Sequence, residues 1–177
     1  MGEGVQVLDE DLNPIAPGSG VVGKLARGGH VPVGYYNAPE KSAETFVEAN
    51  GQRWSLPGDL AMVETDGTIT LLGRGSTSIN TGGEKVFPEE VESQLKAHPD
   101  IYDTLVVGVA DDSFGQAVTA VVQLRDNTSL ELDELREFCR GSLAGYKIPR
   151  QLVACDKIKR SPAGKADYPW AKQFAQG

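Results

Sequence analysis

Three charged side chains stand on short segments shaped by proline and glycine, where they could do chemistry. Asp59 directly follows a Pro-Gly pair, and its two carboxylate oxygens could accept hydrogen bonds from a vicinal diol. Arg74 places a guanidinium next to the flexible Gly75, and Lys165 places an ammonium at the end of the segment Ser-Pro-Ala-Gly-Lys. Taken singly, they also fit plainer interpretations: a capped turn, a surface or salt-bridged arginine, and a solvated lysine.

Two glycine patterns resemble phosphate-binding loops but do not meet the requirements of one. Residues 18–23 have the G-x-G-x-x-G spacing, yet that motif needs a strand before it and a helix after it. Here two prolines precede it and a strand pattern follows, so we predict a turn. Gly164 and Lys165 lack the second glycine and the Ser or Thr of a Walker loop, because position 159 is Lys and position 166 is Ala.

Composition and charge exclude several classes of function. The 40% hydrophobic content of 177 residues can build one domain or two small ones. The formal net charge of −8 argues against non-specific binding to nucleic acid or anionic membrane. A local basic cluster is nevertheless present at Lys157, Lys159, Arg160 and Lys165. No apolar run approaches the roughly 20 residues that cross a bilayer, so we predict no transmembrane segment.

The two cysteines give no sign of a metal site. Cys139 and Cys155 lie among apolar residues, without metal-ligand spacing and without a neighbouring His or Cys. We predict that both are buried free thiols in a reducing cytoplasm, and that no residue of the chain ligates a metal.

The first part of the chain is predicted to consist of short strands separated by turns. Asp66-Gly67 between two alternating runs is the strongest hairpin signal in the sequence. Pro39 suits the first turn of a helix that continues to Phe46. The predicted strands are residues 5–8, 21–26, 54–56, 60–63 and 68–72.

From residue 79 onward the pattern changes to alternating strands and helices. Pro88 opens a helix whose first turn is acidic, which suits its positive end, and His98-Pro99 stops it. Strongly apolar, β-branched runs at 105–109 and 118–124 predict central strands. A helix with its apolar stripe at Leu132, Leu135 and Phe138, ending near residues 141–145, a strand at 151–155 and a helix at 167–174 complete the pattern. The fold class is therefore α+β, with the change of pattern near residues 74–76.

Several segments, in order, resemble the adenylate-forming superfamily of acyl-CoA synthetases, peptide-synthetase adenylation domains and luciferases. The segments are residues 28–40, 56–61, 73–92, 143–150 and 161–165. The resemblance extends over nearly the whole chain, and the match at Gly-Gly-Glu-Lys-Val of residues 82–86 is nearest to bacterial fatty-acyl-CoA synthetases. Each segment is modestly specific, but their common order is hard to obtain by accident.

The resemblance implies a domain organisation. Residues 1–73 would be the end of a large N-terminal domain, forming a small β-rich, distorted barrel-like subdomain. Residues 74–76 would be a hinge, and residues 77–177 a mobile, compact α+β lid domain with a central mixed sheet. The rest of the N-terminal domain would be joined in cis. Consistent with this, Val5 begins a strand directly after Met1 and Gly-Glu-Gly, so the start looks cut from a longer protein.

The resemblance also implies an enzyme, an ATP-dependent acid–thiol ligase that works in two steps. A carboxylic acid of the fatty-acid class attacks the α-phosphate of ATP to give acyl-AMP, and the thiol of CoA then displaces AMP. Asp59 would accept from both ribose hydroxyls, and Arg74 would bind the ribose and phosphate region. Lys165 would be catalytic, neutralising charge at the reacting carboxylate and the α-phosphate. The cofactors would be ATP, Mg²⁺ and CoA.

Members of this superfamily reuse one active site by rotating the small domain between the two steps. Gly75 and Ser76 would form the hinge, although the family usually has Asp or Lys where Ser76 stands. In the second state Lys165 would swing away and a hairpin would line the channel for the pantetheine arm of CoA. The residues implied for that channel are Gly82, Gly83, Glu84 and Lys85. Glu90 is predicted to cap or pair locally and so hold the hairpin.

Some of the family's parts are missing from these residues, and alternatives stay open. The loop that cradles pyrophosphate, the segment that closes around the adenylate and the acyl pocket are not found, so phosphate and metal sites would lie outside the chain. We therefore expect the chain alone to be inactive. A carrier protein could replace CoA as acceptor. A truncated, non-catalytic interaction module and an unrelated α+β binding protein are further alternatives. The acyl group and the oligomeric state, a homodimer included, stay undetermined.

Overall fold

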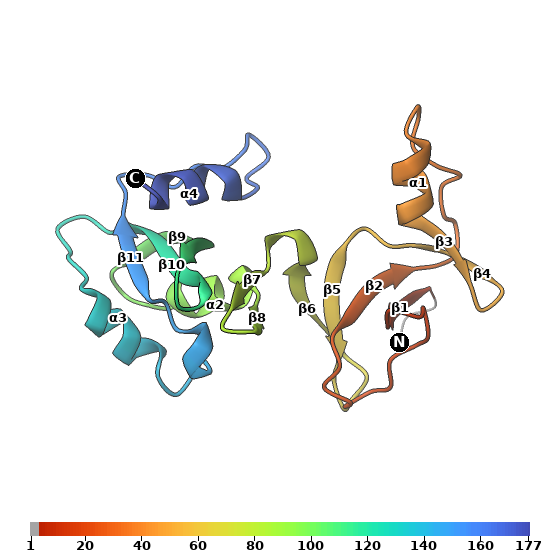
Figure 1. Cartoon of the computed structure of the whole chain (residues 1–177), viewed down its shortest axis with the longest axis horizontal. Coiled ribbons are helices and arrows are strands. Elements are labelled where there is room, and N and C mark those ends of the chain that lie inside the picture. The colour runs from red at the N-terminus through yellow and green to blue at the C-terminus, as the bar shows by residue number, and fades with distance from the viewer. Residues whose placement is uncertain (1–3) are drawn as a thin grey trace. The chain divides into compact units, whose positions relative to one another are not determined.

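The protein divides into two compact units, which the computed structural model describes over residues 4–177. The first unit is Met1–Ser76 and the second is Thr77–Gly177. Met1 and Gly2, on which the expectation of a cut start rests, lie outside the described residues. Figure 1 shows the elements of each unit, and each unit is described below by itself.

The first unit is built on one antiparallel sheet. Its strands lie in the order β3-β4-β2-β5-β6, with β1 paired to β2. The sheet does not close, since β3 and β6 form its two ends, so the subdomain is an open sheet rather than a barrel. The elements are β1 (Val5–Leu8), β2 (Gly23–Arg27), α1 (Pro39–Thr45), β3 (Phe46–Ala49), β4 (Gln52–Ser55), β5 (Asp59–Val63) and β6 (Ile69–Arg74).

Local turn chemistry explains most of these elements. Gly67 has φ 83° and the Asp66 carboxylate accepts from the Thr68 amide at 2.8 Å, so the predicted β5–β6 hairpin is confirmed. The prediction of helix at Phe46 was wrong, because α1 ends at Thr45 and Phe46 begins β3. A second hairpin follows, turning at Asn50-Gly51 with φ of 53° and 73°, which is the backbone that a two-residue hairpin turn requires.

The G-x-G-x-x-G segment is confirmed as a turn, and its last glycine has a packing role. Gly18 and Gly20 have φ of 72° and 70°, and the segment leads into β2 rather than into a helix. Gly23 opens β2 where the strand passes β1 closely. A methyl group on it would overlap the Leu8 carbonyl oxygen and the Ile15 side chain, which both belong to the tightly packed interior.

Replacing Gly23 with alanine is therefore expected to destabilise the first unit. Because a backbone carbonyl cannot swing aside as a flexible side chain can, the overlap should cost about 1–3 kcal/mol of the free energy of unfolding. Gly145→Ala is the matched control, since a methyl there meets no atom within 4 Å. Urea denaturation of both variants checks the difference, and equal midpoints for the two would contradict the packing argument.

The second unit is a mixed sheet between helices. The strand order is β11-β10-β9, with β9 antiparallel and β11 parallel to β10, as the predicted mixed sheet requires. However, β9 is an edge strand and not a central one as predicted. The elements are β7 (Ile79–Thr81), β8 (Glu84–Val86), α2 (Pro88–Leu95), β9 (Ile101–Asp111), β10 (Gly115–Leu124), α3 (Leu132–Cys139), β11 (Gln151–Ala154) and α4 (Tyr168–Ala175), with 3₁₀ turns η1 (Gly75–Thr77) before them and η2 (Gly145–Lys147) before β11.

The two faces of this sheet bury separate cores. Because side chains alternate along a strand, Val106 packs on the face covered by α2 and α3, and Leu105 on the face covered by α4. Figure 1 shows α4 on one side of the sheet and α3 on the other. Cys139 is buried in the first core, Cys155 is partly buried against the second, and burial raises the pKa of both thiols. Both cysteines are free, as predicted.

A buried carboxylate accepts a hydrogen bond from one backbone amide of the edge strand β9. Glu92 of α2 is 6% exposed, and its Oε1 accepts from the Val106 amide at 2.9 Å. Burial raises the pKa of Glu92, and the Val106 bond partly opposes that rise. Among residues 4–177, none of the helices is both long enough and apolar enough to cross a bilayer.

Candidate functional site

The structure brings Asp59 and Arg74 together at one end of the β5–β6 hairpin. They are directly opposite each other in the ladder, and Arg74 Nε donates to Asp59 Oδ1 at 3.3 Å. Gly58, with φ 91°, turns the chain into β5, and its carbonyl accepts from the Gly75 amide at 3.2 Å. The carboxylate is held at a defined place and stays partly exposed, with 26% of its side-chain surface accessible. An acceptor and a guanidinium thus lie side by side on the surface.

The predicted hinge residues lie at the division between the two units. Gly75 and Ser76 follow β6 directly and belong to η1. The first compact unit ends at Ser76. The tight turn therefore sits where the chain passes from one packed core to the next.

The predicted channel residues form the turn of the β7–β8 hairpin. Gly82 and Gly83 have φ of 59° and 87°, so both central positions are left-handed, as a type I′ turn requires. The Gly82 amide donates to the Phe114 carbonyl at 2.9 Å, which holds the turn against the loop before β10. Glu84 and Lys85 open β8 with exposed side chains. The tip of this hairpin is bare backbone.

Lys165 stands on a tight loop with a defined backbone. The Gly164 amide donates to the Ser161 carbonyl, and the Ser161 amide donates to the Lys165 carbonyl, both at 2.8 Å. The Ser161 hydroxyl also accepts from the Lys165 amide at 3.1 Å. Gly164 takes φ 77°, which follows naturally from a turn with proline at its first central position. The side chain itself is exposed, and its ammonium has no ion-pair partner anywhere in residues 4–177.

Two residues at the base of this loop were not predicted from the sequence. Arg160 donates to both carboxylate oxygens of Asp103 on β9, at 2.8 Å each, and to the Gly164 carbonyl at 3.3 Å. Burial by itself would raise the pKa of Asp103, but the bonds from Arg160 and from the Thr104 amide, with the charge of Lys96 nearby, lower it. The sequence placed Arg160 in a basic cluster, and nothing in the pattern pointed to an acidic partner 57 residues away.

The structure does not bring Lys165 next to the hairpin. In Figure 1 the loop that precedes α4 projects beside that helix, well apart from the β7–β8 hairpin of the same unit. The two candidate elements of the second unit therefore occupy different parts of its surface.

Glu90 pairs, but not locally as predicted. Lys147 of η2 donates to both of its oxygens, at 2.7 and 2.8 Å, across 57 residues of sequence. Since η2 also contacts β8, this ion pair ties the start of α2 to the segment that supports the hairpin.

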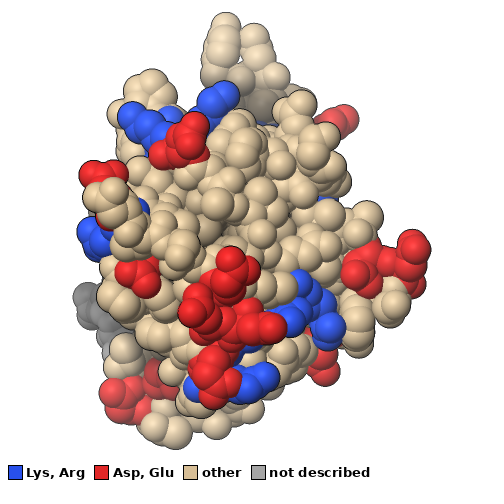
Figure 2. All heavy atoms as spheres, turned by 90° about the vertical axis from the view of Figure 1, so that its left-hand side faces the viewer, with Lys and Arg blue, Asp and Glu red and all other residues tan. Residues whose placement is uncertain are grey.

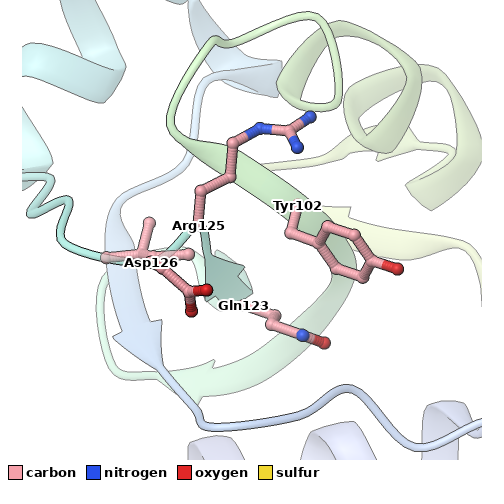
Figure 3. A pocket seen from close by; sticks show the side chains of 5 residues that line it. Tyr102, Gln123, Arg125 and Asp126 are labelled. Carbon is pink, nitrogen blue, oxygen red and sulfur yellow. The ribbon is translucent and has the colours of Figure 1, made fainter.

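Two hollows on the second unit are lined by residues other than the predicted site residues. One is lined by Tyr102, Gln123, Leu124, Arg125 and Asp126. Figure 3 shows its labelled side chains diverging rather than converging on one point. Two of its polar groups are already bonded, Gln123 to the Ile158 amide at 3.1 Å and Arg125 to the Pro99 carbonyl at 2.9 Å.

Some charged side chains elsewhere on the second unit pair with one another. Acidic side chains gather on the face shown in Figure 2, on the side where α3 lies, and basic side chains border them. Arg136 pairs with Asp133 at 3.2 Å, and Arg140 pairs with Glu137. Across residues 4–177, no three His, Cys, Asp or Glu side chains gather to hold a metal ion.

Comparison with known proteins identifies the family. Residues 90–165 match the model for the AMP-binding enzyme C-terminal domain. The chain is 60% identical over 170 residues to a 3-oxocholest-4-en-26-oate–CoA ligase of Rhodococcus rhodochrous, covering 96% of this chain and 31% of the relative. It is 59% identical over 167 residues to a medium/long-chain-fatty-acid–CoA/3-oxocholest-4-en-26-oate–CoA ligase of Mycobacterium tuberculosis, covering 94% of this chain and 30% of the relative.

A solved structure agrees with these relatives. The o-succinylbenzoate CoA synthetase of Bacillus subtilis, in complex with an acyl-adenylate intermediate, matches with a TM-score of 0.83 at 28% identity, over 95% of this chain and 33% of that one. The chain thus spans about a third of the length of the proteins it matches. The fold and the ordered motifs agree with the resemblance found in the sequence, and residues 90–165 belong to the family of AMP-binding enzyme C-terminal domains.

Proposed function

We propose that this chain is the C-terminal part of an AMP-forming acyl-CoA synthetase. The observation that carries the proposal is the 60% identity to a CoA ligase over 96% of the chain. The chain spans 31% of that relative, so a larger N-terminal domain joined in cis would supply the phosphate loop, the Mg²⁺ site and the acyl pocket. Residues 1–73 would complete that domain, residues 74–76 would be the hinge and residues 77–177 the mobile lid.

The substrates would be ATP, CoA and an apolar carboxylic acid. The two reported relatives are named for medium- and long-chain fatty acids and for a steroid acid. We infer a carboxylate on a large apolar body, with a fatty acid as the first candidate. Localisation would be cytoplasmic, where ATP and CoA are available.

The roles proposed for the side chains follow from their charge and placement. Asp59 has carboxylate oxygens that can accept from two ribose hydroxyls, while Arg74 beside it can donate to the ribose and phosphate region. Lys165 carries an ammonium without a carboxylate partner among residues 4–177, on a loop of fixed backbone, so its charge is available to a developing negative charge. Mg²⁺ would accompany the ATP phosphates, and it supplies charge neutralisation there when bound.

The two parts of the second unit's surface suit two successive steps. With the lid in one orientation, the Lys165 loop would face the α-phosphate. After rotation about Gly75 and Ser76, the bare turn of Gly82 and Gly83 would line the path of the thiol, since missing side chains leave room for a narrow pantetheine arm. The separation of the two elements on one unit supports this scheme.

The proposal is tested by AMP release from the complete protein. We expect AMP release that depends on ATP, on CoA and on one acid from a panel of fatty and steroid acids. This 177-residue chain alone is the control, and we expect it to be inactive. AMP release that needs a carrier protein with a free thiol, instead of CoA, would replace the acceptor. Absence of any acid-dependent pyrophosphate exchange in the complete protein would reject the enzyme assignment.

Replacing Asp59 with asparagine is expected to weaken ATP binding. Hydrogen bonds to a charged group contribute about 1.5–3 kcal/mol, so KM for ATP should rise by about 10-fold or more while KM for the acid changes little. Glu48→Gln is the matched control, because Glu48 also faces an arginine of the first unit, Arg53 at 3.8 Å, on an exposed surface. Equal KM values for the two variants would remove Asp59 from the nucleotide site.

A further inference from the structure

The Lys165 loop has hydrogen bonds of its own, but it is joined to the body of the unit at few points. Its hydrogen bonds close it on itself, through Ser161, Gly164 and Lys165. An isolated bridge between Arg160 and Ala166 closes its base. The direction in which the whole loop projects must therefore be set by whatever holds that base to the sheet.

Arg160 provides that connection. Its guanidinium grips Asp103 with two parallel bonds of 2.8 Å, a geometry that fixes orientation as well as distance. A third bond of the same side chain, to the Gly164 carbonyl at 3.3 Å, reaches the residue directly before Lys165. One planar group thus links the sheet to the tip of the loop.

The carboxylate that receives Arg160 is itself held firmly. Asp103 has 18% of its side-chain surface exposed, accepts from the Thr104 amide at 2.9 Å and lies 3.4 Å from the ammonium of Lys96, the residue that follows α2. It belongs to β9, whose ladder with β10 spans ten paired residues. The pair is less screened than an exposed one, and its anchor belongs to a ladder of ten residue pairs.

We propose that the Asp103–Arg160 ion pair positions Lys165 for acyl-adenylate formation, an inference that rests on the proposed function. Neither residue touches substrate in this scheme, so both are positioning residues. The Lys165 ammonium must lie at hydrogen-bonding distance from the α-phosphate. Displacing it by about an ångström through a tilt of the loop should therefore slow acyl-adenylate formation by roughly 10- to 100-fold. The second step, in which Lys165 takes no part, should not depend on the pair.

The first test measures the loop itself in this chain. Asp103→Asn keeps the shape of the side chain but removes its negative charge. It also replaces one carboxylate oxygen, an acceptor, with an amide nitrogen that donates and faces the guanidinium of Arg160. The amides of Ser161, Gly164 and Lys165 should then exchange with solvent faster, by roughly 10-fold. Glu137→Gln is the matched control, since it breaks another arginine–carboxylate pair of the same unit and should leave these three amides unchanged.

The second test is a double-mutant cycle in the complete protein. Asp103→Asn is expected to slow single-turnover acyl-AMP formation by roughly 10- to 100-fold, while thioester formation from supplied acyl-AMP stays within about 2-fold. In a Lys165→Ala background the same substitution should cause no further loss, because the pair acts only through that lysine. Arg160→Lys keeps the positive charge but loses the forked geometry of the guanidinium. It should therefore slow adenylation about as much as Asp103→Asn does, while lowering the melting temperature less than Asp103→Asn.

The outcomes separate this inference from the proposed function. Normal adenylation in Lys165→Ala would overturn the role of the lysine and the function built on it. If Lys165→Ala slowed adenylation, but Asp103→Asn changed neither adenylation nor the amide exchange of the Lys165 loop, only the positioning role would be overturned. Equal losses in both half-reactions, or an additive loss in the Lys165→Ala background, would show a general structural role and also overturn it.

Discussion

Replacing Lys165 with alanine is expected to slow acyl-adenylate formation by about 10²- to 10³-fold, equivalent to about 3–4 kcal/mol of transition-state stabilisation. The reason is that a charged donor aimed at the reacting carboxylate and α-phosphate acts on charge that develops in the transition state. The exposed ammonium has no partner among residues 4–177, so its loss leaves no carboxylate unpaired there and should barely change stability. Pyrophosphate exchange in the complete protein measures the effect.

Thioester formation gives the internal control for this prediction. Supplied acyl-AMP should react with CoA at a nearly normal rate in Lys165→Ala, because the proposed rotation removes the lysine from the site in that step. Lys172→Ala on α4 is the matched variant, since it deletes another exposed lysine of the same unit. A similar loss in both variants would mean that general charge, rather than one placed ammonium, accounts for the change.

Proline at position 76 is expected to separate the two half-reactions. Proline fixes its own φ near −65° and restricts the backbone of the residue before it. The single substitution Ser76→Pro therefore restricts the backbone at positions 75 and 76 together. A lid that cannot turn should keep one half-reaction and lose the other by roughly 10²-fold, since the wrong group then faces the substrate. Single-turnover measurement of acyl-AMP formation, and separately of thioester formation, shows which orientation is retained.

Ser76→Ala is the matched variant for this experiment. It removes the hydroxyl but leaves backbone freedom intact, so both half-reactions should stay close to normal. If Ser76→Pro slowed both steps equally, a local defect in η1 would explain the loss better than a blocked rotation. If it slowed neither, the pivot would have to lie elsewhere in the chain.

Local chemistry made much of the fold predictable. Asp66-Gly67 specified a hairpin, and Pro39 and Pro88 each opened a helix, because these residues restrict the backbone without help from distant contacts. The β3–β4 hairpin was missed because Glu40 to Phe46 has a good helical composition and the Asn50-Gly51 turn was overlooked. The position of β9 at an edge was not predictable from its residues, since its apolar character comes from burial by helices on both faces.

The candidate site was predictable to a different extent. Asp59 and Arg74 were identified through motifs, and their direct pairing across a hairpin follows from the register that the turn sets. Asp103 was not found, because an ion pair between a strand and a loop 57 residues later depends on the tertiary fold. The partner of Glu90 was missed for the same reason, since Lys147 lies equally far along the chain.

The bond from Val106 to the buried Glu92 has a consequence for self-association. An edge strand ordinarily presents free amides that can pair with a strand from a second molecule. At Val106 that amide is already taken by a carboxylate from α2. Two copies could extend a common sheet through this point of β9 only by displacing Glu92, so the carboxylate opposes aggregation by strand addition there.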